Sequence, residues 1–181
     1  MRKSKLQLKL YPHQIKTLAK KNGEEEALSL YEAVYEELAQ TTDPVLYYDY
    51  NVPAYPLFAG ILLCGNGPDR LASQYAKENR MREEHILRIL TAELLRQADH
   101  ALRELIRVEK RSRIERLAAT EGEELDEVLA VCRERWPDQP PLRTDAPGTI
   151  VYAGRLGAQF GCSNGGACQS CTSPTCGYRT G

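Results

Sequence analysis

The sequence predicts a mainly α-helical protein with an N-terminal strand–helix–helix unit, a long helical middle and a small Cys-rich, metal-binding tail. Residues near the start alternate between apolar and polar, residues 70–121 contain neither Gly nor Pro, and four cysteines lie close together near the C-terminus. A chain of 181 residues can bury one sizeable core, or a smaller core with an appended module. We expect four segments: the strand–helix–helix unit at 1–40, a helical scaffold at 41–136, a linker at 137–148 and the tail at 149–181.

Charge is distributed unevenly along the chain, although the formal net charge is only −1. Residues 1–22 contain seven Lys or Arg and no acid, whereas residues 23–43 contain seven acids and no base. This asymmetry indicates that the N-terminal end faces a polyanion such as nucleic acid. The longest apolar run, at 57–64, is much shorter than the roughly 20 residues that cross a bilayer. Because no signal peptide is visible either, we expect a cytoplasmic protein.

The first 40 residues change from an alternating pattern to a helical one. Residues 5–10 read Lys-Leu-Gln-Leu-Lys-Leu, which predicts a strand with leucines on one face and polar side chains on the other. Pro12 suits the first turn of a helix, and Asn22 with Gly23 can end that helix in a left-handed cap. A second helix is expected at 24–39, where apolar residues recur at helical spacing behind three glutamates.

The middle of the chain predicts helices around one irregular segment. Residues 41–67 combine prolines with four tyrosines, which indicates an ordered linker or short strands packed on the helices. A long helix at 70–121 must bend near residues 77–80, or associate with a second copy, to cover its apolar face. Thr120 and Glu123 form a capping-box pattern for a last helix reaching Trp136, and 150–152 predict a short strand. The expected apolar face of the long helix consists of Leu87, Leu90, Leu94, Ala98, Ala101, Leu105 and Val108.

The order of strand, helix, glycine and helix in the first 40 residues resembles the ribbon-helix-helix family of DNA-binding proteins. The run Leu6-Gln-Leu-Lys-Leu-Tyr-Pro12 is similar to the family's strand followed by proline, and residues 25–38 are similar to its second helix. The resemblance implies a homodimer whose paired strands enter the major groove and present three side chains to the bases. These side chains belong to Lys5, Gln7 and Lys9, and we expect phosphate contacts from Lys3, Lys16, Lys20 and Lys21.

Two features depart from the family pattern. The first helix is about one turn shorter than is usual in the family, and Glu24, Glu25 and Glu26 occupy the position where the family holds a backbone phosphate. Carboxylates at that position repel a phosphate. In the alternative interpretation, residues 5–10 form an ordinary edge strand whose lysines prevent aggregation.

The tail carries the strongest signal for a metal site. Its four cysteines have the spacing C-x5-C-x2-C-x4-C, and glycines between them allow the chain to fold around an ion. A compact set of four thiolates suits tetrahedral zinc or an iron–sulfur cluster. Zinc is favoured, although the first three cysteines resemble the cluster loop of 2Fe–2S ferredoxins, and a tail without metal is the third possibility. The expected ligands are Cys162, Cys168, Cys171 and Cys176, whereas Cys64 and Cys132 are expected to be buried thiols.

No complete catalytic motif occurs in the chain, which favours a protein that is not an enzyme. His13, His85 and His100 are expected at the surface, because their positions do not converge on a site. The leading hypothesis is a DNA-associated regulatory or accessory protein with a four-Cys metal-binding tail. The alternatives are a small iron–sulfur redox or sensor protein, and a modified-peptide precursor with a Cys/Ser/Thr-rich core at the C-terminus.

Overall fold

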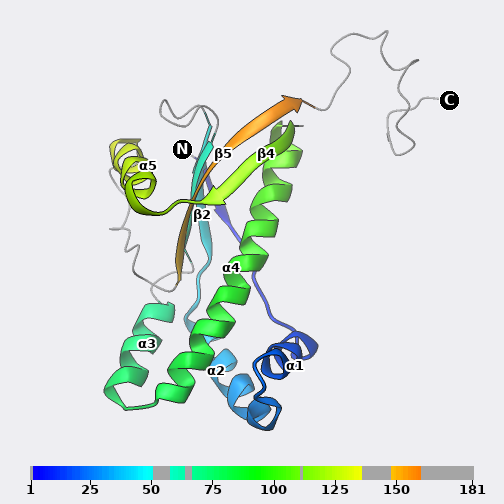
Figure 1. Ribbon diagram of the computed structural model, residues 1–181, viewed down its shortest axis with the longest axis vertical. Helices are drawn as coiled ribbons and strands as arrows, with labels where there is room; N and C mark the ends of the chain where they lie inside the picture. Colours follow the sequence, from blue (N-terminus) through cyan, green and yellow to red (C-terminus); the bar gives the residue numbers. More distant parts are fainter. Residues whose placement is uncertain (1, 51–57, 64–66, 111, 136–147, 160–181) are drawn as a thin grey trace, which may run out of the picture.

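The part of the chain that the structure describes is mainly helical and contains an antiparallel sheet (Figure 1). The computed structural model describes residues 2–50, 58–63, 67–110, 112–135 and 148–159. The helices within these residues are α1 (Pro12–Lys21), the 3-10 helix η1 (Glu25–Ala27), α2 (Leu28–Thr41), α3 (Gly67–Lys77), α4 (Met81–Lys110) and α5 (Gly122–Arg135). The strands are β1 (Arg2–Lys5), β2 (Val45–Asp49), β3 (Phe58–Leu63), β4 (Ser112–Ala119) and β5 (Thr149–Gln159).

The sheet has the strand order β1-β2-β3-β5-β4, and every neighbouring pair is antiparallel. β2 and β3 confirm the expectation of short strands in the tyrosine-rich segment. The expected strand at 150–152 is also present, but it extends over Thr149–Gln159 and lies between β3 and β4. The first part of the segment expected as a tail therefore belongs to the sheet, and the Cys-rich run follows it.

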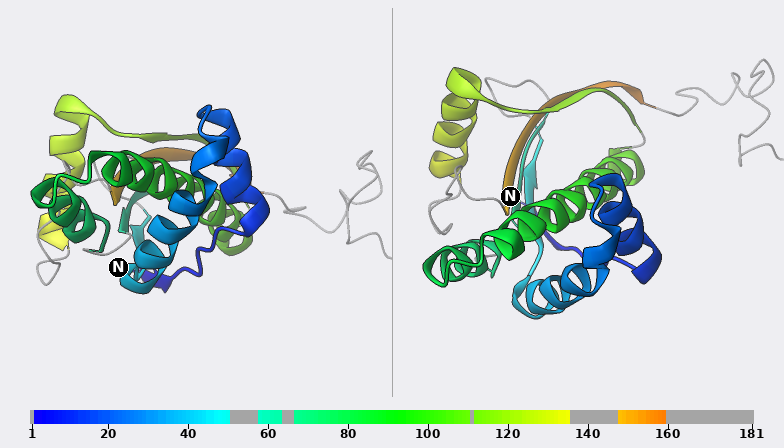
Figure 2. Two further views of the ribbon diagram at one scale, coloured as in Figure 1. Left: turned by 90° about the horizontal axis from the view of Figure 1, so that it is seen from below. Right: turned by 60° about the horizontal axis from the view of Figure 1, so that its bottom comes forward.

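Helices α4 and α5 cover opposite faces of the sheet (Figure 2). Successive side chains of a strand point to opposite faces, so Tyr152 packs toward α4 whereas Val151 and Ala153 pack toward α5. The core beneath α5 also contains Cys132, which is 1% exposed and confirms the expected buried thiol. The buried residues between α4 and the sheet are Leu46, Tyr48, Tyr50, Ala98, Leu102, Ile106 and Tyr152.

The N-terminal half of α4 packs against α1, α2 and α3 in a separate core (Figure 1). The chain between β1 and α1 contributes Leu10 to this core, and its backbone N–H donates a 2.7 Å hydrogen bond to the hydroxyl of Tyr35. α4 is thus the element that both cores share. The buried residues of the helical core include Leu10, Ile15, Ala19, Tyr31, Val34, Leu38, Tyr75, Ile86, Leu87, Leu90 and Leu94.

The buried face of α4 follows the expected one only through its first half. After Ala98 the buried positions continue at Leu102 and Ile106, whereas Val108, an expected member of the face, is 72% exposed. Repeated steps of four residues rotate this face around the helix, because four residues slightly exceed one turn. The face turns in this way as α4 passes from the helical core to the sheet. No helix in the described part of the chain is both long and apolar enough to span a membrane.

The expected helix over residues 70–121 divides into two helices and a strand. The expected bend is confirmed, since α3 ends at Lys77 and α4 begins at Met81. Residues 112–119 were expected to continue the helix, and this expectation is wrong, because they form β4 and pair with β5. The absence of Gly and Pro allows both structures, and sheet pairing overrides the local helix propensity.

Thr120 does not form the expected capping box. Helix α5 begins at Gly122, and the Thr120 backbone N–H donates a 2.9 Å hydrogen bond to the carbonyl of Val151 in β5. Its hydroxyl donates to the same carbonyl at 3.3 Å. Thr120 therefore extends the pairing with β5 instead of capping α5. The expected helix is nevertheless present.

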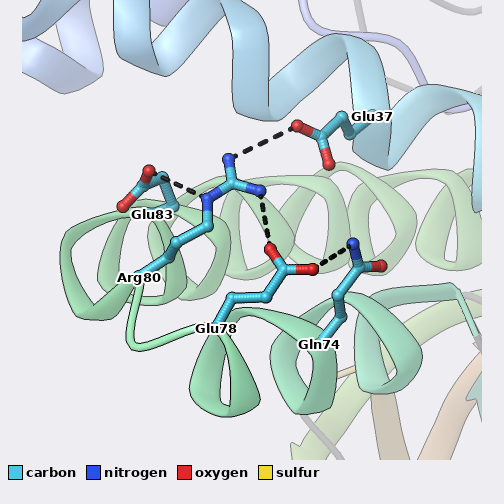
Figure 3. A network of polar contacts seen from close by, with 5 residues as sticks. All are labelled: Glu37, Gln74, Glu78, Arg80 and Glu83. Atoms are coloured by element: carbon cyan, nitrogen blue, oxygen red, sulfur yellow. Dashed lines mark hydrogen bonds and ion pairs between the residues drawn. The ribbon is translucent and has the colours of Figure 1, made fainter.

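The bend between α3 and α4 is held by local and tertiary contacts. Asn79 takes a left-handed conformation with φ of 58°, and Arg80 N–H bonds the carbonyl of Tyr75 at 2.8 Å, which ends α3. The Arg80 guanidinium reaches Glu78 at 3.3 Å, Glu83 at 3.0 Å and Glu37 of α2 at 3.6 Å (Figure 3). The side chain also lies over the ring of Tyr75, 4.3 Å from its centroid. One cation thus links three helices.

The N-terminal helices agree with the sequence, whereas the preceding strand is displaced. Gly23 follows α1 with φ of +70°, as expected for a left-handed cap. The second helix begins at Leu28 after η1, so the glutamates precede it. β1 ends at Lys5 and not at Leu10. Lys5 pairs with Val45, and the residue before Val45 is Pro44, which interrupts the pairing. Proline cannot donate to a ladder, so only the Pro44 carbonyl continues it, by accepting from Leu6 N–H at 3.0 Å.

Candidate nucleic-acid interface

Four polar residues ahead of α1 form an exposed row, although only part of it is a strand. Leu6 and Leu8 are half-buried, and Leu10 is buried, so the expected alternation persists beyond β1. This segment passes α4 on its way from the sheet to α1 (Figure 1). The leucines fix the polar side chains on the outside. We call the exposed side chains of Lys3, Lys5, Gln7 and Lys9 the basic row.

Few carboxylates neutralise the basic row. Lys5 Nζ lies 3.8 Å from Asp43 Oδ1, with side chains 73% and 72% exposed. A pair as exposed as this contributes about 0–1 kcal/mol and exchanges readily with another anion. Lys3 and Lys9 form no ion pair with any residue that the structure describes. The positive charge of the row therefore remains available to a ligand.

Helix α1 extends the positive surface. Burial of Ile15 and Ala19 turns Lys16 and Lys20, one turn apart, toward solvent. Lys20 Nζ lies 3.9 Å from a carboxylate oxygen of Glu25, and both side chains are well exposed. Lys16 has no ion-pair partner within the described ranges. The five residues expected to contact DNA thus all lie at the surface, on one continuous stretch of chain.

One of the three glutamates after α1 is turned away from this surface. The Glu24 carboxylate accepts a 2.7 Å hydrogen bond from the hydroxyl of Tyr31 and lies 3.6 Å from Arg82 of α4. Burial raises the pKa of Tyr31, and the hydrogen bond to Glu24 adds to this effect. Glu24 therefore has a structural partner. With Glu25 beside Lys20, Glu26 is the member of the group that has no ion-pair partner in the described part of the chain.

Two exposed aromatic rings lie at the end of the basic row. Tyr11 is 53% exposed, and its ring stacks with that of His13 at a centroid distance of 5.9 Å and an interplanar angle of 13°. Lys9 Nζ lies 5.6 Å from the centroid of the Tyr11 ring. The Tyr11 backbone N–H donates a 2.9 Å hydrogen bond to Gln14 Oε1, which fixes the start of α1. Rings and cation therefore occupy one rigid corner.

The start of the N-terminal segment is held by Glu109, near the end of α4. Its carboxylate accepts hydrogen bonds from the hydroxyls of Tyr48 at 2.7 Å and Tyr50 at 2.9 Å, and from Arg2 at 2.6 Å. Lys110 Nζ lies 4.1 Å from the centroid of the Tyr50 ring. We call Arg2, Tyr48, Tyr50 and Glu109 the Glu109 cluster. It joins β1, β2 and α4 at the head of the basic row.

The electrostatics of the Glu109 cluster keep its carboxylate charged and its phenols neutral. Partial burial of Glu109 opposes ionisation, but the tyrosine hydrogen bonds and the Arg2 charge outweigh it and lower the pKa. Burial raises the pKa of Tyr48 to about 12, and the hydrogen bond to Glu109 contributes. This cluster was not predicted from the sequence, because its members come from distant parts of the chain. The alternation of Tyr48 and Tyr50 was the available signal, since buried phenols need partners.

The described residues do not test the expected metal site. Cys162, Cys168, Cys171 and Cys176 lie outside the described residues, as does Cys64. Within the part that the structure describes, no group of three or more His, Cys, Asp or Glu could hold a metal ion. His13, His85 and His100 are exposed, as expected. The metal site therefore remains a prediction from the cysteine spacing.

When the chain is compared with known protein family models and with curated proteins, neither comparison gives a match.

Proposed function

We propose that the protein is a DNA-associated regulatory or accessory protein that binds nucleic acid through the basic row and α1. The observation that carries this proposal is the exposure of Lys3, Lys5, Gln7 and Lys9 along a stretch that contains no acid. Lysines arranged in this way bind phosphates and release counterions, which is the main source of affinity for nucleic acid.

Each residue of the interface has a role that follows from its chemistry. Lys5, Gln7 and Lys9 are the candidates for base contacts, since Lys donates to guanine and Gln can pair with adenine. Lys16 and Lys20, exposed on the adjoining helix, are the candidates for phosphate contacts. With three to five phosphate contacts, log Kd should rise with log salt with a slope of about 2 to 4.

A homodimer is part of the proposal. β1 has one neighbour, β2, among the described strands, so it lies at the edge of the sheet. An edge strand presents unpaired N–H and C=O groups to a second chain. Pairing of two copies through β1 would bring two basic rows together and double the charged surface. Analytical ultracentrifugation with and without DNA tests this part.

Titration of fluorescently labelled DNA, followed by anisotropy at about 50 and about 200 mM salt, tests binding. The variant pair Lys9→Ala with Lys16→Ala should weaken binding and reduce the salt slope. A matched control, Lys77→Ala with Arg133→Ala, removes two exposed charges from other helices and should bind like the unmodified protein. Absence of binding at low salt, or equal losses in both pairs, would refute the proposal.

We also propose that the tail binds a metal through Cys162, Cys168, Cys171 and Cys176. The support is their spacing, which suits a closed zinc site with no open catalytic position. In the alternative function, a redox or sensor protein, the same thiolates would hold an iron–sulfur cluster. Elemental analysis of anaerobically purified protein separates the two, because zinc protein is colourless and cluster protein is brown. A sample without stoichiometric metal would refute both.

A further inference from the structure

We infer that the nucleic acid bound at this surface is single-stranded, with its phosphates along the basic row and a base stacked against Tyr11 and His13. The inference rests on the proposed function and narrows its ligand. Binding of a single strand requires a line of cations that can follow one nucleic-acid backbone, and an exposed aromatic surface beside that line. Both features occur within residues 3–13.

The basic row has the geometry of a track for one strand. Lys3 and Lys5 are alternate residues of β1, about 6.6–6.8 Å apart along the strand, and the exposure continues to alternate through Gln7 and Lys9. The segment lies against the protein's own core, since Leu6 and Leu8 pack against the sheet and α4. Readers of duplex DNA commonly insert a helix or a two-stranded ribbon into the major groove. Each protomer holds its own row flat on its surface, so one row follows one phosphate backbone whether or not two copies pair through β1.

The aromatic corner, formed by Tyr11 and His13, adds a surface for base stacking, which a purely electrostatic surface lacks. More than half of the Tyr11 side chain is exposed, although aromatic rings gain most from burial. The backbone that carries the ring is held in place, because the Tyr11 carbonyl accepts from the N–H groups of Gln14 at 2.8 Å and Ile15 at 3.1 Å. Ile15 is buried in the helical core, so the platform does not depend on a flexible loop. The Tyr11 ring is exposed and has Lys9 Nζ over it, 5.6 Å from its centroid, so an aromatic surface and a cation are available to a base at one place.

Competition between nucleic acids of equal length tests the inference. Labelled oligo-dT of about 16 nucleotides is the probe, and the competitors are unlabelled oligo-dT, oligo-U and duplex DNA of the same length. We expect the single strands to compete better than the duplex at one salt concentration. Stronger competition by oligo-dT would assign DNA as the source of the strand, and stronger competition by oligo-U would assign RNA. Stronger competition by the duplex would overturn the inference.

Variants of the aromatic corner separate stacking from charge. Tyr11→Ala should weaken oligo-dT binding about 5- to 100-fold without changing its salt slope, whereas Tyr11→Phe should keep most of the affinity. Circular dichroism checks that α1 is intact in both variants. Unchanged binding by Tyr11→Ala would overturn the inference. If Lys9→Ala with Lys16→Ala still weakens binding in that case, the proposed function stands; if no nucleic acid binds at low salt, both fail.

Discussion

Replacing Glu109 by Ala should destabilise the protein more than replacing any other surface residue near the end of α4. The change removes the common acceptor of Tyr48 and Tyr50 and the partner of Arg2. The two tyrosines are only 4% and 7% exposed, so their hydroxyls lose a charged acceptor in a place that water reaches poorly. The link between α4 and the first two strands weakens at the same time.

The magnitude follows from the two tyrosine hydrogen bonds. A hydrogen bond to a charged group contributes about 1.5–3 kcal/mol, so two such bonds set an upper range of about 3–6 kcal/mol. The Glu109 side chain keeps 24% exposure, and water will replace part of the lost acceptor. We therefore expect a loss of about 2–4 kcal/mol in the free energy of unfolding.

Urea unfolding followed by far-ultraviolet circular dichroism measures this loss. Glu104→Ala is the matched control, because Glu104 lies on the same helix, is 51% exposed and pairs only at 3.5 Å with Arg107 among the described residues. The control should cost less than about 0.5 kcal/mol. Since the folded-state pKa of Glu109 is lowered, its contribution is present above the ordinary value of 4.5 and disappears as the pH falls through the folded-state pKa. Equal costs for both variants would refute the assigned role of Glu109.

Three further predictions concern other parts of the molecule. The pKa of Tyr48 rises from 10.0 to about 12 on folding, so its contribution to stability is complete below pH 10 and is lost as the pH rises toward 12. In an alkaline titration, the Tyr48→Phe variant should therefore lose less stability than the unmodified protein. Arg80→Ala should lower the free energy of unfolding, measured in urea, by about 1–2 kcal/mol, because the cation joins three helices. Arg88→Ala removes one ion pair within a single helix and should cost less. The double variant Cys168→Ser with Cys171→Ser should abolish metal binding, measured by elemental analysis, and leave the thermal melting of the helices unchanged. A large loss of helical stability would contradict a tail that closes around its metal without help from the helices.

Signals in the sequence indicated the limits of α1 and the break between α3 and α4. Pro12 and Gly23 marked the limits of α1, and the bend near residues 77–80 followed from the length of the apolar stripe. Gly and Pro act through the backbone of their own residue, so their effect can be read locally. The limits of α1 were predictable for this reason, whereas the break near residues 77–80 contains neither Gly nor Pro and was one of two ways to cover the long apolar stripe.

The sheet could be predicted only in fragments, because its pairing depends on distant residues. β4 lies next to β5, and both contribute to the sheet although about thirty residues separate them in sequence. Residues 112–119 have no periodicity that excludes a helix, and the hydrogen bonds of β5 decide their conformation. The exposure of the basic row was predictable from alternation, whereas the Glu109 cluster was not, since it requires the fold.

The two ends of the N-terminal segment explain how a short stretch, of which only the first part is a strand, can form the proposed binding surface. At one end Glu109 holds Arg2, and at the other Leu10 is buried and bonded to Tyr35. The residues between them are therefore held in place before any ligand arrives. A flexible lysine-rich segment would lose conformational entropy on binding, at roughly 1–2 kcal/mol for each residue that becomes ordered. If the segment binds nucleic acid as proposed, its order in the folded protein leaves more of the phosphate attraction as affinity, and variants that disrupt the Glu109 cluster should then also weaken binding.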